Sequence, residues 1–301
     1  MAVTRIGTRG SPLALAQAIE VRNKLMAAHD LPQDAFEITV IKTTGDAIQN
    51  RPLSEIGGKG LFTRELEIAL DDGRIDIAVH SMKDVPTVLP DGHEISTILD
   101  RENVHDALVS ATATGIDDLP QGAVFGTSSL RRRAQLLAHR PDLKMVDFRG
   151  NVQTRLKKLD DGIATATLLA RAGLNRLDQP DLGHDIPTNV LLPAIAQGAV
   201  GIEHRSDTDL AAVLAPIHHA DTATRITCER AFLRTLDGSC RTPIAGLATL
   251  ADGVLHFQGE VLRPDGSQTL QSTRTGPATD AEHLGTDAAQ QVLAQGSASF
   301  F

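Results

Sequence analysis

The chain has 301 residues, 41% hydrophobic and 22% charged, the proportions of an ordinary globular protein long enough for two or three domains. Its formal net charge is −9, and with eight Phe but no Tyr or Trp it offers few aromatic surfaces on which single-stranded nucleic acid could stack. No segment is apolar enough for a membrane span, no secretion signal precedes the first strand-like segment, and the two cysteines form no disulfide framework. We therefore expect a cytoplasmic protein that binds neither membrane nor nucleic acid.

The first helix is expected to follow a short strand at Arg5–Gly7. Ser11 can cap this helix and Pro12 can occupy its first position, where a missing N–H costs nothing. Apolar residues then recur at helical spacing as far as Leu25. Arg9 lies in the turn between strand and helix, where it could bind an anion or form an ion pair within the fold.

A polar stretch follows the second predicted strand, which covers residues 36–43. The stretch ends in a glycine-rich sequence around Lys59, whose ammonium group could reach an anion. It could form a mobile flap or a plain loop before a helix over residues 61–70.

Asp84 follows a short apolar strand predicted over residues 75–80. Pro86 restricts Val85 to extended conformations, so the turn is stiff and Asp84 is held at a strand end, where α/β proteins place reactive groups. A carboxylate there could stabilise a developing cation, or it could pair with Lys83 or a helix N-terminus.

Alternating strands and helices continue through residues 106–177, after a polar segment at residues 100–105 that we interpret as a hinge. This pattern predicts two α/β units with mainly parallel sheets. Asp221 could cap a helix over residues 222–236. Turn residues then separate three strands before a last helix, which predicts a small α+β tail with strands at 244–250, 254–262 and 268–273 and a helix at 280–294.

Residues 126–158 form a basic stretch in this acidic chain, with six Arg, three Lys and two Asp, a local charge of about +7. Two turns within it combine small or helix-capping residues with arginines whose fixed donor forks suit carboxylates and phosphates. The predicted anion-binding residues are Arg131, Arg132, Arg149 and Arg155. The remaining cations of the stretch are expected to lie on a solvated face.

The two cysteines occupy different settings. Cys228 lies on the predicted 222–236 helix at a core spacing, whereas Cys240 follows Gly238 in a loop beside Arg241. A lone cysteine without a fixed His partner is a weak signal of chemistry. No His, Asp and Glu set has metal-ligand spacing, so no metal site is expected.

Six motifs in order make the chain similar to the hydroxymethylbilane synthase family, also called porphobilinogen deaminases. The similarity runs from Arg5 to about Ala251. The motifs are GTRGSPLALAQ at 7–17, GGKGLFTRELE at 57–67, DIAVHSMKDVPT at 76–87, GTSSLRRRAQL at 126–136, RGNVQTRLKKLD at 149–160 and LDGSCRTPIAG at 236–246.

The resemblance implies a monomer with three domains. The first would comprise residues 1–99 with 200–220 and the second residues 100–199, both α/β folds like type II periplasmic binding proteins. The third, residues 221–301, would be the small α+β domain that carries the cofactor cysteine.

The resemblance also implies a transferase of tetrapyrrole, porphyrin and haem biosynthesis. A dipyrromethane cofactor would be attached to Cys240 by a thioether and serve as primer. Four porphobilinogen molecules would each lose ammonia to give an electrophilic azafulvene, join the chain, and be released by hydrolysis as the linear tetrapyrrole hydroxymethylbilane. Asp84 would be the catalytic carboxylate.

Site residues carried over from the family fall into three groups. Those implied to hold the cofactor are Lys83, Asp84, Thr127, Ser129, Arg131, Arg132 and Arg155. Those implied to hold the substrate are Arg9, Ser11, Arg149, Arg155 and Arg176, and a covering flap would include Lys59 and Phe62.

The chain departs from the family pattern in two places. It reads Ile163-Ala164-Thr165-Ala166 where the family has an aromatic residue followed by Asp-Ala, and Ala196-Gln197-Gly198 where the family has Gly-Gln-Gly. Both departures concern packing and turn stiffness in the second domain.

The competing hypothesis is a non-enzymatic clamshell that binds a small oxyanion. It would explain the hinge and the arginines, but not Cys240 in its loop or the additional C-terminal domain. The transferase explains all of these features.

Overall fold

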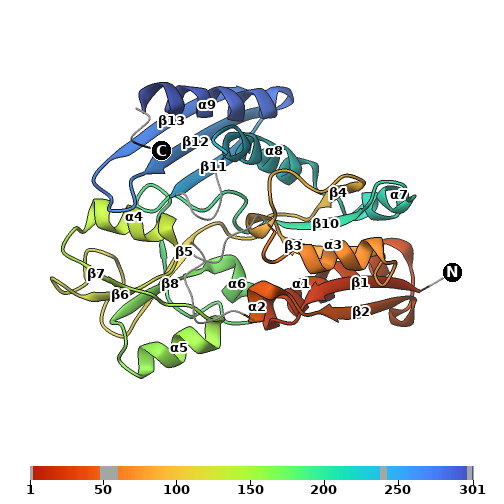
Figure 1. Cartoon of the computed structure of the whole chain (residues 1–301), viewed down its shortest axis with the longest axis horizontal. Helices are drawn as coiled ribbons and strands as arrows, with labels where there is room; N and C mark the ends of the chain where they lie inside the picture. Colours follow the sequence, from red (N-terminus) through yellow and green to blue (C-terminus); the bar gives the residue numbers. More distant parts are fainter. Residues whose placement is uncertain (1–2, 48–59, 238–242, 297–299, 301) are drawn as a thin grey trace. The chain divides into compact units, whose positions relative to one another are not determined.

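A computed structural model describes residues 3–47, 60–237, 243–296 and Phe300 (Figure 1). Within these residues the chain forms two compact units. The first holds the chain up to Glu102 together with Gly198–Ala223, and the second holds Asn103–Gln197 and the chain from Thr224 onward.

The first unit is built on a five-stranded sheet in the order β2-β1-β3-β10-β4. The parallel strand β1 lies between β2 and β3, and β10 runs antiparallel to both β3 and β4. The strands are β1 (Thr4–Arg9), β2 (Phe36–Ile41), β3 (Ile77–Ser81), β4 (His93–Ile98) and β10 (Val200–Arg205).

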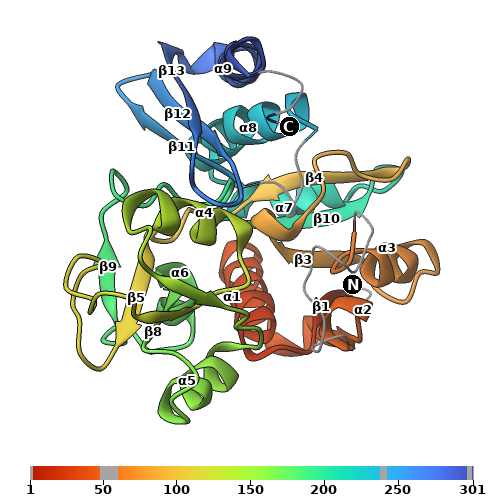
Figure 2. The same cartoon turned by 60° about the vertical axis from the view of Figure 1, so that its left-hand side comes forward.

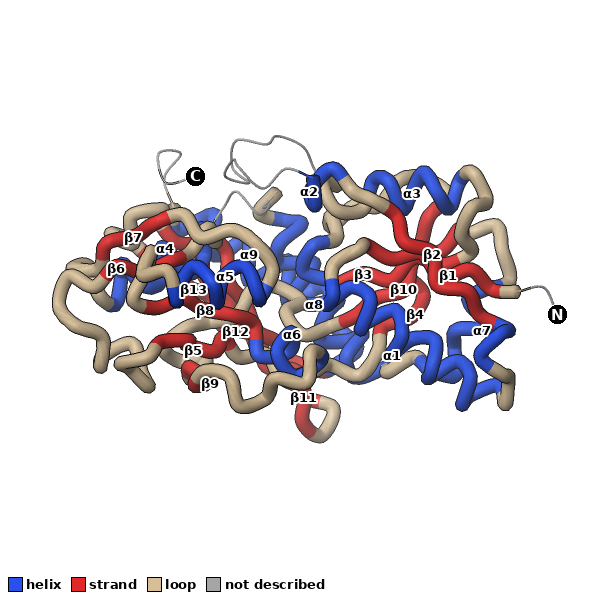
Figure 3. Tube along the Cα trace, turned by 90° about the horizontal axis from the view of Figure 1, so that it is seen from below, coloured by secondary structure: helices blue, strands red, loops and turns tan. Residues whose placement is uncertain are grey.

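Helices cover both faces of this sheet (Figure 3). Helices α1 (Pro12–His29) and α7 (Leu210–Leu214) pack on one face, where Val21, Leu25 and Leu214 join one apolar core. Helix α3 (Arg64–Asp71) covers the other face, and the short helix α2 (Thr44–Ala47) precedes it. The predicted start of α1 is confirmed: Ser11 Oγ accepts a hydrogen bond from the Ala14 N–H, and Pro12 is the first helical residue.

The second unit repeats the same plan with the strand order β7-β6-β8-β5-β9. Apolar residues of α4 (Leu130–His139) join one core, and those of α5 (Val152–Asp160) and α6 (Arg171–Arg176) join another on the opposite face (Figures 1 and 2). The strands are β5 (Asp106–Ser110), β6 (Val124–Gly126), β7 (Lys144–Val146), β8 (Ala166–Ala170) and β9 (His184–Ile186).

The prediction of mainly parallel sheets is wrong in part, because both sheets are mixed. In each, three strands run parallel, and β10 or β5 pairs antiparallel with both of its neighbours. Strands β10 and β5 follow the segments at which the chain passes from one unit to the other, rather than a crossover helix, and only a crossover returns a strand parallel to its neighbour.

The C-terminal part of the chain forms an antiparallel sheet, β11 (Ile244–Ala251), β12 (Val254–Leu262) and β13 (Thr269–Pro277). Helices α8 (Ala220–Thr235) and α9 (Ala281–Gln295) lie side by side on one face of it (Figure 2). Phe232 of α8 packs on Phe257 of β12 with ring centroids 5.0 Å apart. Asp221 was expected to cap α8, but the helix begins at Ala220, one residue before Asp221. The His219 ring nitrogen Nδ1 accepts a hydrogen bond from the Thr222 N–H instead.

The three sheets with their flanking helices confirm two α/β parts and a small α+β part. Over the same ranges, no helix combines the length and apolar character that a membrane crossing requires.

Candidate active site

The turn that carries Asp84 is fixed by hydrogen bonds on both sides. At the end of β3, Ser81 Oγ pairs with the buried Gln17 side chain of α1 at 2.9 Å. The Met82 N–H then donates to the Ala199 carbonyl, 3.0 Å away. A single 3-10 turn, Met82–Asp84, follows, and Val85 continues in extended conformation. The predicted stiff turn is therefore present.

Arg9 joins this turn from the end of the adjacent strand β1. Its Nη1 lies 3.6 Å from Asp84 Oδ2, and its guanidinium lies 4.1 Å from the centre of the Phe62 ring. Asp84 keeps 31% of its side chain exposed, so solvent or a ligand can still reach the carboxylate. The structure thus brings three predicted site residues of the first unit together, with Ser11 two residues beyond Arg9.

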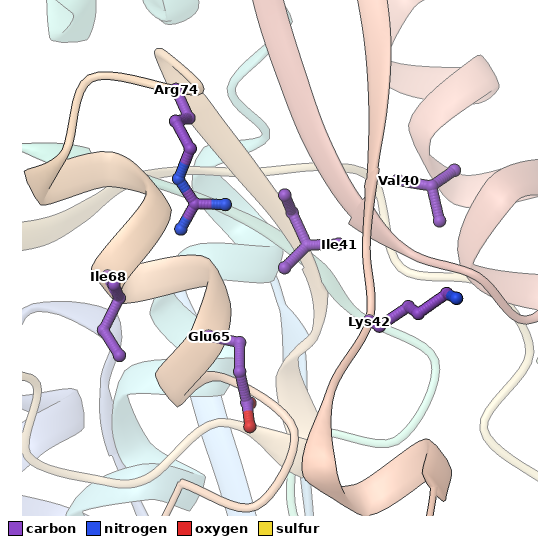
Figure 4. Close-up of a pocket in the computed structure, with 6 residues that line it drawn as sticks. All are labelled: Val40, Ile41, Lys42, Glu65, Ile68 and Arg74. Carbon is purple, nitrogen blue, oxygen red and sulfur yellow. The ribbon is translucent and has the colours of Figure 1, made fainter.

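A cavity of about 250 Å³ lies elsewhere in the same unit, between β2 and α3 (Figure 4). None of the residues predicted for chemistry lines it. It is an open surface hollow lined by Val40, Ile41, Lys42, Glu65, Ile68 and Arg74.

Two predicted arginines of the second unit share one buried carboxylate. Arg131 Nη2 and Arg132 Nη2 each lie 2.6 Å from an oxygen of Asp106, the first residue of β5. Their other Nη atoms donate to the carbonyls of Leu192 and Leu168. Despite complete burial, the two guanidinium groups hold the pKa of Asp106 far below its usual range. Both arginines therefore bind a carboxylate inside the chain, and their role toward a cofactor stays a prediction.

Arg155, on the first turn of α5, has no such partner. Its Nε donates to the Gly150 carbonyl at 2.9 Å, and within the described residues no carboxylate forms an ion pair with it. Burial, together with the neighbouring charges of Arg132 and Arg149, lowers the pKa of Arg155 to about 10. Removal of water and repulsion between like charges both disfavour the cation, so this cluster would gain from binding an anion.

Thr127 and Ser129 shape the N-terminus of α4. Ser129 is the N-cap, and its Oγ accepts from the Arg132 N–H at 3.4 Å. Thr127 Oγ1 accepts from the Ser129 N–H at 3.2 Å. These hydroxyls fix the turn at a helix end whose dipole favours anions.

The remaining site residues are placed as follows. Arg149 lies between β7 and α5, Arg176 ends α6, and Lys83 is exposed in the Asp84 turn. Lys59 and Cys240 lie outside the described residues. Cys228 is fully buried, as expected for a core position, and burial raises the pKa of its thiol to about 12.

Sequence reasoning missed Asp106 and Gln197. Gln197 is almost fully buried, and its Nε2 donates to Asp106 Oδ1 at 3.1 Å, so it is a third donor to that carboxylate. The available signal was an acidic residue at the start of the apolar run Asp106–Val109. Such a residue needs cationic partners if it is buried.

The departure at Ala196 falls at a demanding backbone position. Ala196 has φ +60°, a left-handed conformation that glycine adopts more easily, and Gly198 has φ +88°. Buried Glu229 of α8 accepts a hydrogen bond from the Ala196 N–H at 2.6 Å, which holds the turn.

The other departure lies at the start of β8. Ile163 is exposed, Ala164 is buried, and the Thr165 N–H donates to the Val124 carbonyl at 2.8 Å. Ordinary sheet pairing is thus retained there.

Two protein-family models match the chain. The first is described as "Porphobilinogen deaminase, dipyromethane cofactor binding domain" and matches residues 4–212. The second is described as "Porphobilinogen deaminase, C-terminal domain" and matches residues 223–294.

Curated relatives give the same result. A porphobilinogen deaminase of Paracoccus denitrificans is 60% identical over 99% of this chain and 96% of its own length. A chloroplastic porphobilinogen deaminase of Pisum sativum is 53% identical over 100% of this chain and 84% of its own. Among solved structures, a periplasmic substrate-binding protein from Coxiella burnetii matches at TM-score 0.42 and 15% identity, over 74% of this chain and 94% of its own. From the family models and the curated relatives we conclude that the chain belongs to the porphobilinogen deaminase family.

Proposed function

We propose that this enzyme builds its product on a dipyrromethane attached to Cys240, with Asp84 as the catalytic carboxylate. The family is one of transferases that make the linear tetrapyrrole hydroxymethylbilane from porphobilinogen, and this chain is a member. The proposal assigns the individual residue roles within that reaction.

The observation that carries the proposal is the unneutralised charge at Arg155. A dipyrromethane bears acetate and propionate groups, and the cation cluster of Arg155, Arg132 and Arg149 matches this chemistry. Binding a carboxylate would offset both the burial and the repulsion that lower the pKa of Arg155. The N-terminus of α4, capped by Ser129, adds N–H groups that favour a negative charge. The residues present therefore fit the group.

When bound, the cofactor would supply the free pyrrole carbon to which the first substrate unit is added, and each later unit would be added to the end of the growing chain. Asp84 would accept hydrogen bonds from pyrrole N–H groups and stabilise the positive charge that develops when ammonia leaves porphobilinogen. Arg9, 3.6 Å from Asp84, would keep that carboxylate oriented and bind a substrate carboxylate, together with Ser11, Arg149 and Arg176.

The remaining assignments follow the family. Lys83, Thr127, Ser129, Arg131, Arg132 and Arg155 would hold the cofactor, and Lys59 and Phe62 would belong to a flap. Porphobilinogen would be the substrate, no nucleic acid or membrane would take part, and the enzyme would act as a cytoplasmic monomer.

Intact-mass spectrometry tests the attachment directly. The purified protein should be heavier than its sequence by one dipyrromethane, and digestion should place the added mass on the peptide that contains Cys240. Brief exposure to porphobilinogen should add further pyrrole units in discrete steps, because the growing product stays covalently bound until hydrolysis.

The second cysteine provides a matched control. Cys228→Ser should retain the extra mass, because the Cys228 thiol is fully buried and protonated, and should lose only some stability. Cys240→Ser should have the bare sequence mass and no activity. Fully active protein at the bare sequence mass would rule out the covalent cofactor.

A further inference from the structure

Four ionisable side chains form a buried ion chain across the first unit: His80 on β3, Glu203 on β10, His93 on β4 and Asp71 at the end of α3. The side chains of Glu203, His93 and His80 are 0%, 1% and 3% exposed, whereas Asp71 opens to solvent. None of the four has a role in the reaction described above.

His93 lies between two carboxylates. Its Nδ1 is 2.7 Å from Glu203 Oε1, and its Nε2 is 3.0 Å from Asp71 Oδ1. An ionised carboxylate only accepts hydrogen bonds, and a neutral imidazole has a single N–H. A neutral ring would therefore place a nitrogen lone pair against a carboxylate oxygen. Only the doubly protonated ring donates to both partners.

The charges around His93 favour this state. Burial opposes a cation, but the hydrogen bonds to Asp71 and Glu203 outweigh it and raise the pKa of His93 above its usual value. Burial raises the pKa of Glu203, but its close contacts with His80 and His93 outweigh burial and lower that pKa.

The other charged groups are on the elements packed around the ring. His80 Nε2 lies 2.8 Å from Glu203 Oε2, and Arg205 Nη1 of β10 lies 3.5 Å from Asp71 Oδ1. Glu67 of α3 faces the same cluster, and burial followed by the negative charge of Glu203 raises its pKa. Three carboxylates, those of Glu203, Asp71 and Glu67, therefore surround His93, and the Arg205 guanidinium is shared between Asp71 and Asp207, whose Oδ2 lies 2.6 Å from it.

Glu203 connects these four side chains to β3, the strand that leads into the Asp84 turn. It sits where the pairing of β10 with β4 shifts register, and it lies opposite Ala78 of β3. The same strand pair ends at Val200 opposite Ser81, after which Met82 bonds to Ala199. Glu203 therefore contacts His93 of β4 and His80 of β3, and its contact with His80 lies just before the Met82–Asp84 turn.

We propose that His93 is a buried imidazolium and that, through Glu203, it is a positioning residue for the turn that carries Asp84. The charge state rests on geometry alone, and the positioning role rests on the proposed function of Asp84.

The charge state can be measured by NMR on the whole enzyme with ¹⁵N-labelled histidine. At pH 7, where an ordinary histidine is mostly neutral, one ring should show two protonated nitrogens, and His93→Gln should remove that signal. Asp71→Asn is the safer variant because Asp71 is 57% exposed. By removing one acceptor it should let the ring lose its proton at a lower pH. A neutral His93 ring at pH 7 in the unaltered enzyme would overturn the proposal.

The free energy of unfolding should depend on the protonation of His93. Because the pKa of His93 is raised in the folded state, its stabilisation is complete below about pH 6.5 and is lost as pH rises through the folded value. Between about pH 6.5 and the raised pKa of His93 in the folded state, the equilibrium constant for unfolding should thus rise roughly tenfold per pH unit. Asp71→Asn should narrow this pH range, because with one acceptor removed the pKa of His93 is raised less. Gln290→Ala, exposed on α9 and without an ionisable group, is the control and should leave the pH slope unchanged.

The pH dependence of kcat tests the positioning role. The alkaline fall in kcat should move to lower pH in Asp71→Asn, with KM unchanged and the fold intact by circular dichroism, and should not move in Gln290→Ala. A protonated His93 whose loss leaves kcat unaffected would refute the positioning role. Full activity of Asp84→Asn would instead refute the proposed function, while the NMR result on His93 would stand independently.

Discussion

At the scale of single residues, the first unit places Asp84 and Arg9 at the ends of adjacent parallel strands, within 3.6 Å of each other. Both side chains are partly exposed, so this pair contributes on the order of 1 kcal/mol or less to stability. We therefore propose that the pair serves a ligand more than the fold.

Asp84→Asn tests that view, since it keeps the shape of the side chain and removes its charge. We expect kcat to fall by about 10²-fold or more, as for loss of an electrostatic stabiliser, while the covalent cofactor is retained and urea unfolding is nearly unchanged. Asp91→Asn, in an exposed turn, is the control and should keep full activity. Near-normal turnover in Asp84→Asn would remove Asp84 from the chemistry.

The arginines of the second unit require a different strategy. Replacing Arg131 would leave buried Asp106 without one of its two arginines, a change that typically costs about 3–5 kcal/mol. Loss of cofactor in such a variant would therefore not distinguish binding from folding. Arg155 can be replaced without leaving a carboxylate of the described chain unpaired, so it is the better probe of the cofactor site.

At the scale of elements, α8 and α9 pack unusually closely at Gly285. A Cβ atom on Gly285 would lie 2.1 Å from the Cys228 carbonyl oxygen and 3.0 Å from Ala231. The first contact is with backbone, so a side-chain rotation cannot relieve it. This close approach holds the two helices on their sheet.

In Gly285→Ala, a gain in helix propensity opposes a loss from overpacking. Alanine is favoured over glycine in a helix interior by about 1 kcal/mol, but overpacking costs about 1–3 kcal/mol or more. Because the contact is with backbone, we expect a net loss of about 1–2 kcal/mol in the free energy of unfolding by urea. Gln290→Ala, exposed on the same helix, should change it by about 0.5 kcal/mol or less. A stabilised Gly285→Ala would show that the helices separate at low cost.

At the scale of the whole molecule, an overall charge of −9 coexists with a basic stretch of about +7. Long-range attraction of anions is therefore weak, and binding depends on the local cluster around Arg155. A ligand that binds only the folded state stabilises it in proportion to the logarithm of its concentration.

Anions should accordingly stabilise the protein that lacks its cofactor. We expect sulfate at about ten times its dissociation constant to raise the melting temperature of Cys240→Ser by about 2–4 °C, compared with sodium chloride at equal ionic strength. Adding Arg155→Met to that variant should abolish the difference. An equal sulfate effect without Arg155 would show that the anion binds elsewhere.

Features that depend on a few neighbouring residues could be predicted from the sequence. The Ser11 cap, the stiff Asp84 turn, the core position of Cys228 and most strand positions follow from local chemistry, since backbone restriction and side-chain periodicity act over a few residues. The six motifs also identified the family. The arginine cluster could be recognised from its composition, but the partner of each arginine in the folded chain could not be predicted.

The remaining features were decided by tertiary structure. Asp106 meets Arg131 from 25 residues away, and His93 meets Glu203 from 110 residues away. The antiparallel insertion of β10 brings that glutamate between two histidines on its neighbouring strands. Burial removes the water that would otherwise solvate these groups, so each buried charge must be compensated by whichever partner the fold supplies. That pairing depends on which strands become neighbours, and no local sequence pattern contains this information.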